Sequence, residues 1–175
     1  IAVLAVIMTY IVFLLLQPAE TGSDDSIILN NNPITFIDPP LALPNFTLTD
    51  SNGDSINLSD LEGQPTLLTF GYTHCPDVCP ITLGEMRNIH EELGDLGNNL
   101  NYVFVSVDGE RDTPEVLESY FRTLRVDDFM IGMTGEEASL RALGIPYGLE
   151  FIYNEADNFG NYTVDHTAGM YLIDS

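Results

Sequence analysis

Alternating and continuous apolar runs predict strands in the first part of the folded chain. Two alternating runs, 45–49 and 55–58, flank the sequence Ser-Asn-Gly-Asp at 51–54 and predict a β-hairpin. The runs 66–72 and 101–108 are largely apolar throughout, which is typical of buried strands. The chain is therefore expected to form an N-terminal hairpin followed by two central strands.

Helices are predicted where apolar residues recur at intervals of three and four. The segment 81–93 has this pattern and is followed by Gly94, a common residue at helix ends. A second helix is predicted to begin at Thr113 and Pro114, because threonine is a frequent cap and proline is tolerated in the first turn, and to run to Leu124. The segment 136–143 predicts a shorter helix.

The last part of the chain predicts further strands. Residues 129–133 form a third apolar run, and 150–154 and 168–173 predict a closing antiparallel pair around the polar loop 155–162. Strands that alternate with helices indicate an α/β domain, with a central mixed β-sheet flanked by helices. Because the chain stops directly after a predicted strand, we expect the domain to continue beyond Ser175.

The N-terminal residues have a different composition. Residues 1–17 are almost entirely apolar, and 18–40 are rich in Ser, Asp, Asn and Pro. The first segment predicts a membrane anchor rather than a cleaved signal peptide, because no small-x-small cleavage site follows it. It has no initiator Met and is slightly short for a full span, so we expect it to begin before Ile1. The second predicts a linker, and 41–175 the folded domain. Acidic residues follow the anchor, so we expect the domain on the extracytoplasmic side, in the periplasm or at the cell surface.

The 175-residue chain is strongly acidic, with 27 Asp and Glu against 5 basic residues and a formal net charge of −22. All the basic residues are arginines. Nucleic-acid binding needs clustered cations, so this composition excludes a nucleic-acid partner. The acidic residues are scattered, which favours a role in solubility, although such a surface also attracts basic proteins and cations.

The only two cysteines lie four positions apart, in the stretch 71–80, Gly-Tyr-Thr-His-Cys-Pro-Asp-Val-Cys-Pro. This stretch joins a predicted strand to a predicted helix, so Cys75 and Cys79 are expected on one side of a first helical turn, where the helix N-terminus favours thiolates. Such a pair can exchange disulfides or hold a soft metal ion. The spacing is wider than the Cys-x-x-Cys of most dithiol oxidoreductases and suits two ligands of one ion, without excluding a disulfide.

A metal held by two thiolates needs a further ligand, and imidazole completes a compact set. His166 lies just before the last predicted strand, from which its ring can reach the loop that carries Cys75. His74 is a weaker candidate because its neighbour Cys75 directs it elsewhere, and His90 is expected to be a solvated helix residue. Spacing alone does not decide whether His166 is a ligand.

Three segments together resemble the Sco/SenC family of copper-binding proteins. They are 71–80, with both cysteines; 108–114, Asp-Gly-Glu-Arg-Asp-Thr-Pro; and 164–173, with Val-Asp-His-Thr followed by Met-Tyr-Leu-Ile. The resemblance covers about residues 41–175, and three blocks in order make it far more specific than the cysteine spacing. Gly109 stands where the family commonly has proline, which we expect to loosen that loop.

The resemblance implies a thioredoxin-like fold and a copper site formed by Cys75, Cys79 and His166. Two thiolates and an imidazole suit Cu(I), and the same set takes Cu(II) with an added oxygen donor. The family's role is assembly of the dinuclear copper centre of cytochrome c oxidase. The expected partners are therefore the copper-receiving subunit of that oxidase and other copper chaperones.

A second interpretation is a thiol–disulfide oxidoreductase in which Cys75 and Cys79 reduce the cysteines of the copper-receiving subunit. It predicts that His166→Ala leaves function intact, whereas copper delivery predicts loss of tight copper binding. Whether the protein is an enzyme depends on this choice. Peroxide reduction is not supported, because the sequence has no Thr-x-x-Cys motif with an arginine partner. Structural zinc is not supported either, because such sites have four ligands and only three are evident here.

Charged residues near the three segments are expected to support the site. Asp77 and Asp165 are candidates for orienting His166 or tuning its charge, and otherwise for helix caps or turns. Arg111 is expected to pair with Asp108 or Asp112 and to hold its loop.

Overall fold

The computed structural model describes residues 35 and 37–174. The predicted membrane anchor, 1–17, and most of the predicted linker, 18–40, lie outside these residues. Within the described ranges, no helix is long and apolar enough to cross a membrane. The strands and helices belong to the compact unit Pro39–Ser175.

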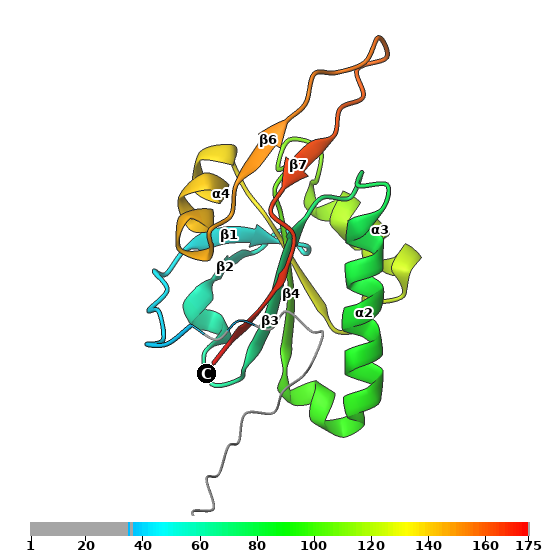
Figure 1. Ribbon diagram of the computed structural model, residues 1–175. Coiled ribbons are helices and arrows are strands. Elements are labelled where there is room, and N and C mark those ends of the chain that lie inside the picture. Colours follow the sequence, from blue (N-terminus) through cyan, green and yellow to red (C-terminus); the bar gives the residue numbers. More distant parts are fainter. Residues whose placement is uncertain (1–34, 36, 175) are drawn as a thin grey trace, which may run out of the picture. The chain divides into compact units, whose positions relative to one another are not determined.

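A mixed sheet of six strands forms the centre of the described part of the chain (Figure 1). Its strand order is β2-β1-β5-β4-β3-β8, with parallel pairs between β3, β4 and β5 and antiparallel pairs elsewhere. A separate two-stranded sheet joins β6 and β7. The strands are β1 Thr47–Asp50, β2 Ser55–Asn57, β3 Thr66–Gly71, β4 Asn101–Ser106, β5 Met130–Thr134, β6 Phe151–Tyr153, β7 Val164–His166 and β8 Met170–Ile173. The predicted hairpin and central strands are confirmed.

Helices cover both faces of the sheet. Helices α2 (Val78–Leu93) and α3 (Pro114–Leu124) lie on one face, and α4 (Glu137–Gly144) lies on the other (Figure 1). Short 3-10 turns complete the fold: η1 Leu58–Leu61, η2 Gly94–Asn99 and η3 Ile145–Tyr147. This arrangement confirms the predicted α/β class and is consistent with the thioredoxin-like fold that the resemblance implies.

Each face of the sheet buries its own apolar core, because successive side chains of a strand point to opposite faces. On the face of α2 and α3, Leu83 and Phe121 belong to one buried cluster with Phe104 of β4. On the other face, Leu140 of α4 is clustered with Val103 of β4. The central strands are therefore packed from both sides, and the loops at their ends start from fixed positions.

The predicted pairing of 150–154 with 168–173 is wrong. Strand β6 pairs instead with β7, which places Phe151 opposite His166. Strand β8 pairs with β3, with Leu172 opposite Leu67. Periodicity identifies strands but not their partners, and here the free edge of β3 offers β8 a full set of backbone hydrogen bonds.

The first helix ends at Leu93 as predicted, with Gly94 after it, but it differs from its prediction at the start and in the burial of two side chains. It begins at Val78, earlier than the predicted Ile81, and Ile81 is 57% exposed. His90, expected to be solvated, is half-buried, and its ring stacks on Phe129 with a centroid distance of 4.2 Å. The prediction failed because η2 folds back against the end of α2, so that Gly97 lies close to the His90 ring.

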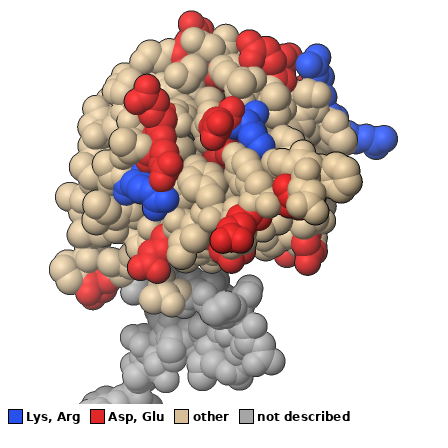
Figure 2. Space-filling view, turned by 90° about the horizontal axis from the view of Figure 1, so that it is seen from above, with Lys and Arg blue, Asp and Glu red and all other residues tan. Residues whose placement is uncertain are grey.

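Acidic side chains are spread over the surface. On the face shown in Figure 2, Asp and Glu side chains lie in many places, with Arg side chains between them. Three arginines form exposed ion pairs with glutamates one helical turn away, as in Arg87–Glu91, Arg122–Glu118 and Arg141–Glu137. Such exposed pairs contribute little to stability. The surface thus follows the scattered pattern seen in the sequence.

Candidate metal centre

The two cysteines lie at the carboxyl end of the central strand β3. Cys75 is in the turn after the strand, where its N–H donates to the Tyr72 carbonyl at 3.2 Å, and Cys79 is in the first turn of α2. The prediction that both cysteines lie in a first helical turn is therefore wrong for Cys75. Both are free thiols, and Cys79 is 3% exposed whereas Cys75 is half-buried.

Gly71, the last residue of β3, determines how close Cys79 comes to the strand. A Cβ atom at this position would lie 2.9 Å from Cys79 Sγ and 2.7 Å from Phe104 Cε2. Real Cβ atoms do not approach other heavy atoms so closely, so a side chain here would displace the sulfur or the ring. The absence of a side chain at Gly71 therefore allows the Cys79 sulfur to pack against the central sheet.

His166, the last residue of β7, reaches this sulfur from a different sheet. Its Nε2 lies 3.7 Å from Cys79 Sγ, and its ring meets the Tyr72 ring edge to face. Its Nδ1 lies 3.0 Å from the Thr167 carbonyl oxygen. Because a carbonyl only accepts, Nδ1 carries the proton of the neutral ring and Nε2 presents its lone pair. The nitrogen that faces the sulfur is the one able to bind a metal.

The structure brings the predicted ligands into one neighbourhood without closing a site. His166 lies beside Cys79, and Cys75 is close enough to raise the pKa of the Cys79 thiol. Among residues 35 and 37–174, no three His, Cys, Asp or Glu side chains are close enough to hold one metal ion. His74 lies apart from this group, with its Nδ1 3.0 Å from Thr73 Oγ1.

Burial is the main influence on the Cys79 thiol. It raises the pKa of this group to about 12, with Cys75 and Asp112 acting in the same direction and the hydrogen bond with the Tyr72 backbone opposing them. Burial at Cys79 thus acts against the predicted preference for a thiolate, because desolvation disfavours the charged form. A bound cation would supply the positive charge that stabilises a thiolate at this buried position.

The buried Asp112, predicted only as a possible partner of Arg111, instead holds the cysteine loop. Asp112 is fully buried and accepts hydrogen bonds from Thr73 N at 2.9 Å, Thr73 Oγ1 at 2.6 Å and Ser106 Oγ at 2.6 Å. Burial raises the pKa of Asp112, and these hydrogen bonds oppose the shift. Asp112 thus connects the end of β4 to the stretch before Cys75.

Arg111 connects the same loop to the segment before His166. It forms an ion pair with Asp108, which confirms one of the two predicted partners, and its Nη1 donates to the Tyr162 carbonyl at 2.9 Å. Its guanidinium lies over the Tyr162 ring, 3.5 Å from the centroid, and the Tyr162 hydroxyl donates to Asp108 at 2.9 Å. The two loops that lead to the predicted ligands are therefore joined by one cluster of contacts.

Other expectations for this region are not met. Asp77 and Asp165 are exposed, and in the described part of the chain neither makes a hydrogen bond with His166. Asp77 stands at the N-cap position of α2, as its alternative role predicted, but its side chain makes no cap hydrogen bond. The loop at Gly109 is closely packed rather than loosened, because a Cβ there would lie 1.8 Å from the Gly135 carbonyl oxygen. The sequence held a signal for the Asp112 contacts, since Asp108 and Asp112 lie in the loop between a buried strand and the next helix.

Comparison with known proteins places these features in a family. A family model described as SCO1/SenC matches residues 37–175. The SCO2-like protein RP587 of Rickettsia prowazekii is 37% identical over 130 residues, which cover 74% of this chain and 62% of that protein. A putative copper-binding protein of Stutzerimonas stutzeri is 32% identical over 151 residues, or 86% of this chain and 72% of that protein.

The fold agrees with a solved relative. The structure of Bradyrhizobium japonicum ScoI with copper bound has a TM-score of 0.71 and 39% sequence identity, and the match covers 76% of this chain and 83% of that one. The chain spans less than two thirds of the length of RP587. With a family model that matches the described domain and a relative that shares its fold, the chain belongs to the SCO1/SenC family.

Proposed function

We propose that this protein is a copper metallochaperone, which holds the ion with the thiolates of Cys75 and Cys79 and the imidazole of His166. Thiolates and imidazole are soft donors that select copper in its reduced state. The same set takes Cu(II) when an oxygen donor is added. Copper is the cargo of such a site rather than a permanent cofactor.

The observation that carries this proposal is the contact between His166 and Cys79. The two residues are 87 positions apart, yet His166 Nε2 lies 3.7 Å from Cys79 Sγ. The Thr167 carbonyl accepts from the other ring nitrogen, as backbone carbonyls commonly do for metal-binding histidines. A ring oriented in this way needs little movement to share an ion with the sulfur.

Differences in exposure among the three donors suit transfer in steps. Cys79 is buried, whereas Cys75 and His166 are half-buried at the surface. A thiolate of a partner can replace His166 or Cys75 first and take the ion from Cys79 last. Because its surroundings raise the pKa of Cys79, copper binding displaces a proton from this thiol and copper release returns one.

We further propose that the acceptor is the copper-receiving subunit of cytochrome c oxidase and that other copper chaperones load the site. Membership of the SCO1/SenC family supports this role. The predicted anchor, 1–17, would keep the domain beside a membrane-embedded oxidase on the extracytoplasmic side. A surface with a net charge of −22 favours partners with basic surfaces.

The test is a copper titration of the full chain in neutral detergent, with both cysteines reduced. We expect about one copper per wild-type chain, with strong thiolate-to-metal absorption. His166→Ala should bind at least about 100-fold more weakly, because a first ligand is lost where even supporting residues change affinity 10- to 100-fold. His74→Ala is the matched control and should bind like wild type. Equal affinities for wild type and His166→Ala would reject the assignment of His166 as a ligand.

A second candidate function is reduction of a partner's disulfide, which two free thiols close together after β3 favour. The more exposed Cys75 would attack the disulfide, and Cys79 would resolve the mixed disulfide. The partner then leaves with two thiols, and a Cys75–Cys79 disulfide remains. A His166→Ala variant that loses copper binding but still reduces a disulfide peptide would assign both activities to the protein.

A further inference from the structure

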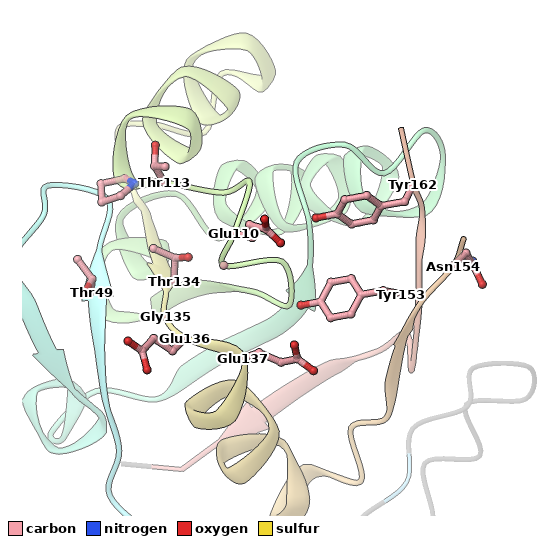
Figure 3. A pocket seen from close by; sticks show the side chains of 12 residues that line it. Thr49, Glu110, Thr113, Thr134, Gly135, Glu136, Glu137, Tyr153, Asn154 and Tyr162 are labelled. Atoms are coloured by element: carbon pink, nitrogen blue, oxygen red, sulfur yellow. The ribbon is translucent and has the colours of Figure 1, made fainter. Parts of the chain in front are cut away.

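A second cavity lies away from the predicted copper ligands, where α3 and α4 begin and β6 ends (Figure 3). Its volume is about 700 Å³, within the range of small-molecule sites. None of Cys75, Cys79 and His166 lines it. The residues that matter for its chemistry are Glu110, Thr134, Glu136, Glu137, Tyr153 and Tyr162.

Thr134, the last residue of β5, presents a polar group without a partner to this cavity. The residue is 5% exposed, and within the described part of the chain its buried Oγ1 makes no hydrogen bond. Figure 3 shows this oxygen directed toward the space between Glu110 and Glu137. A buried hydroxyl without a partner is unfavourable, so the site lacks an atom that bonds to it.

Carboxylates determine the charge of the cavity. Glu110 and Glu136 form no ion pair with any described residue, and Glu137 forms an exposed pair with Arg141. The starts of α3 and α4 also face the cavity, and each helix N-terminus contributes about half a positive charge. The two carboxylates without an ion pair outweigh two such ends of about half a charge each, so the cavity attracts a cation.

The arrangement of the acidic groups fits an extended cation rather than a metal ion. No three acidic side chains in the described ranges converge closely enough to share one ion. Glu110 and Glu137 lie on opposite sides of the space, and the hydroxyl ends of Tyr153 and Tyr162 point inward (Figure 3). Ammonium and guanidinium groups carry several N–H donors, and the alkyl chains that bear them pack on aromatic rings.

We propose that this cavity binds an organic cation, an alkyl ammonium or guanidinium group, through Glu110, Glu137 and the Thr134 hydroxyl. This chemistry occurs in free polyamines and in the lysine or arginine side chains of a protein. In either case the cation neutralises carboxylates that have few partners within the chain, and one of its N–H groups donates to Thr134 Oγ1.

The test is an NMR titration of the isotope-labelled full chain with two probes, spermidine and the peptide acetyl-Gly-Arg-Gly-amide. We expect saturable shifts of the Thr134 and Tyr153 resonances with at least one probe. Binding should weaken about tenfold in Glu110→Gln, which removes a charge-assisted hydrogen bond. It should weaken about fivefold in Thr134→Val, which removes a neutral one. Binding of the peptide but not of spermidine would identify the cation as a protein side chain. Binding of spermidine would identify it as a free polyamine.

The matched control is Glu92→Gln, which removes the same charge from an exposed position on α2. This variant should bind both probes like wild type. The two glutamate variants should keep the wild-type unfolding midpoint, and Thr134→Val should not lower it, because it removes an unpartnered buried hydroxyl. The proposal is overturned if neither probe gives saturable shifts, or if Glu92→Gln weakens binding as much as Glu110→Gln. Displacement of the probes by Mg²⁺ at constant ionic strength would also overturn it, because the site would then be a metal site.

Discussion

The cysteine side and the histidine side of the proposed copper site are built differently. Cys79 lies against Gly71 at the end of the central sheet, and the loop before Cys75 is fixed by the buried Asp112. His166 ends a strand of the separate two-stranded sheet β6–β7. The segment after it, 167–169, is exposed.

The hydrogen bonds that fix the two sides also differ, in how deeply they are buried. Asp112 accepts three hydrogen bonds in a buried position, so losing any of them leaves a polar group without water. The segment after His166 is tied down by bonds nearer the surface, such as that from Thr69 Oγ1 to the Gly169 carbonyl at 2.9 Å. Water can replace such bonds. We infer that the sheet fixes the thiols, whereas local surface contacts fix the imidazole, and mutations on the two sides should have unequal effects.

The largest effect is expected from Asp112→Ala on the cysteine side. The change leaves Thr73 and Ser106 without their acceptor, and we expect the free energy of unfolding to fall by about 2–4 kcal/mol in urea denaturation. Asp128→Ala, at an exposed position, should stay within about 0.5 kcal/mol of wild type. Similar losses in the two variants would refute the idea that buried hydrogen bonds fix this side.

The next largest effect is expected from Gly71→Ala. The added methyl group meets Phe104 and the Cys79 sulfur, and overpacking of this kind lowers the free energy of unfolding by about 1–3 kcal/mol. Gly84→Ala is the matched control, because a Cβ at this helical position meets no atom within 4 Å. It should stabilise the protein by about 0.5–1 kcal/mol. Chemical denaturation of both variants should show that the free energy of unfolding falls in Gly71→Ala and rises in Gly84→Ala.

A smaller effect is expected from Thr69→Val on the histidine side. The change removes the hydrogen bond to Gly169, whose carbonyl is exposed and can bond to water instead, so the loss should be below about 1 kcal/mol. Amide hydrogen exchange at Ala168 and Gly169 should become faster, while exchange in β3 and β4 stays unchanged. Faster exchange throughout the central sheet would show that the two sides are not independent.

The smallest effect is expected in the pH dependence of stability. Burial raises the pKa of Asp112 above its ordinary value of 3.8, so the folded protein holds this proton more tightly than the unfolded chain. The resulting stabilisation is present at low pH and is lost as pH rises from 3.8 through the folded pKa. Asp112→Asn removes this dependence. The unfolding free energy of wild type minus that of the variant should therefore decrease with rising pH, and an increase would contradict the direction of the shift.

Local patterns in the sequence predicted the elements around the site better than their partners. The predicted strand 66–72 matches Thr66–Gly71, and the helix predicted to start at Thr113 and Pro114 starts at Pro114, because strand periods and helix caps are local. The pairing of β8 with β3 was missed, because both possible partners of β8 have similar apolar patterns. Long-range pairing depends on which edge is free, and periodicity carries no information about edges.

The candidate site shows the same limit. The cysteines were identified from composition and spacing, whereas the approach of His166 to Cys79 joins residues 87 positions apart and depends on the hairpin β6–β7. The acceptor of His166 Nδ1 is a backbone carbonyl, that of Thr167, and any residue type supplies one. The sequence pointed to Asp77 and Asp165 because side chains are the only acceptors it distinguishes.

The close approach of Gly109 to Gly135 has a consequence for substitutions in the two turns that carry them. A Cβ atom at Gly109 would lie 1.8 Å from the Gly135 carbonyl oxygen, so no side chain fits there while the facing turn keeps its course. Transplanting the equivalent loop from a relative with proline at this position would require its facing turn as well. Substitutions in the two turns are therefore expected to depend on one another.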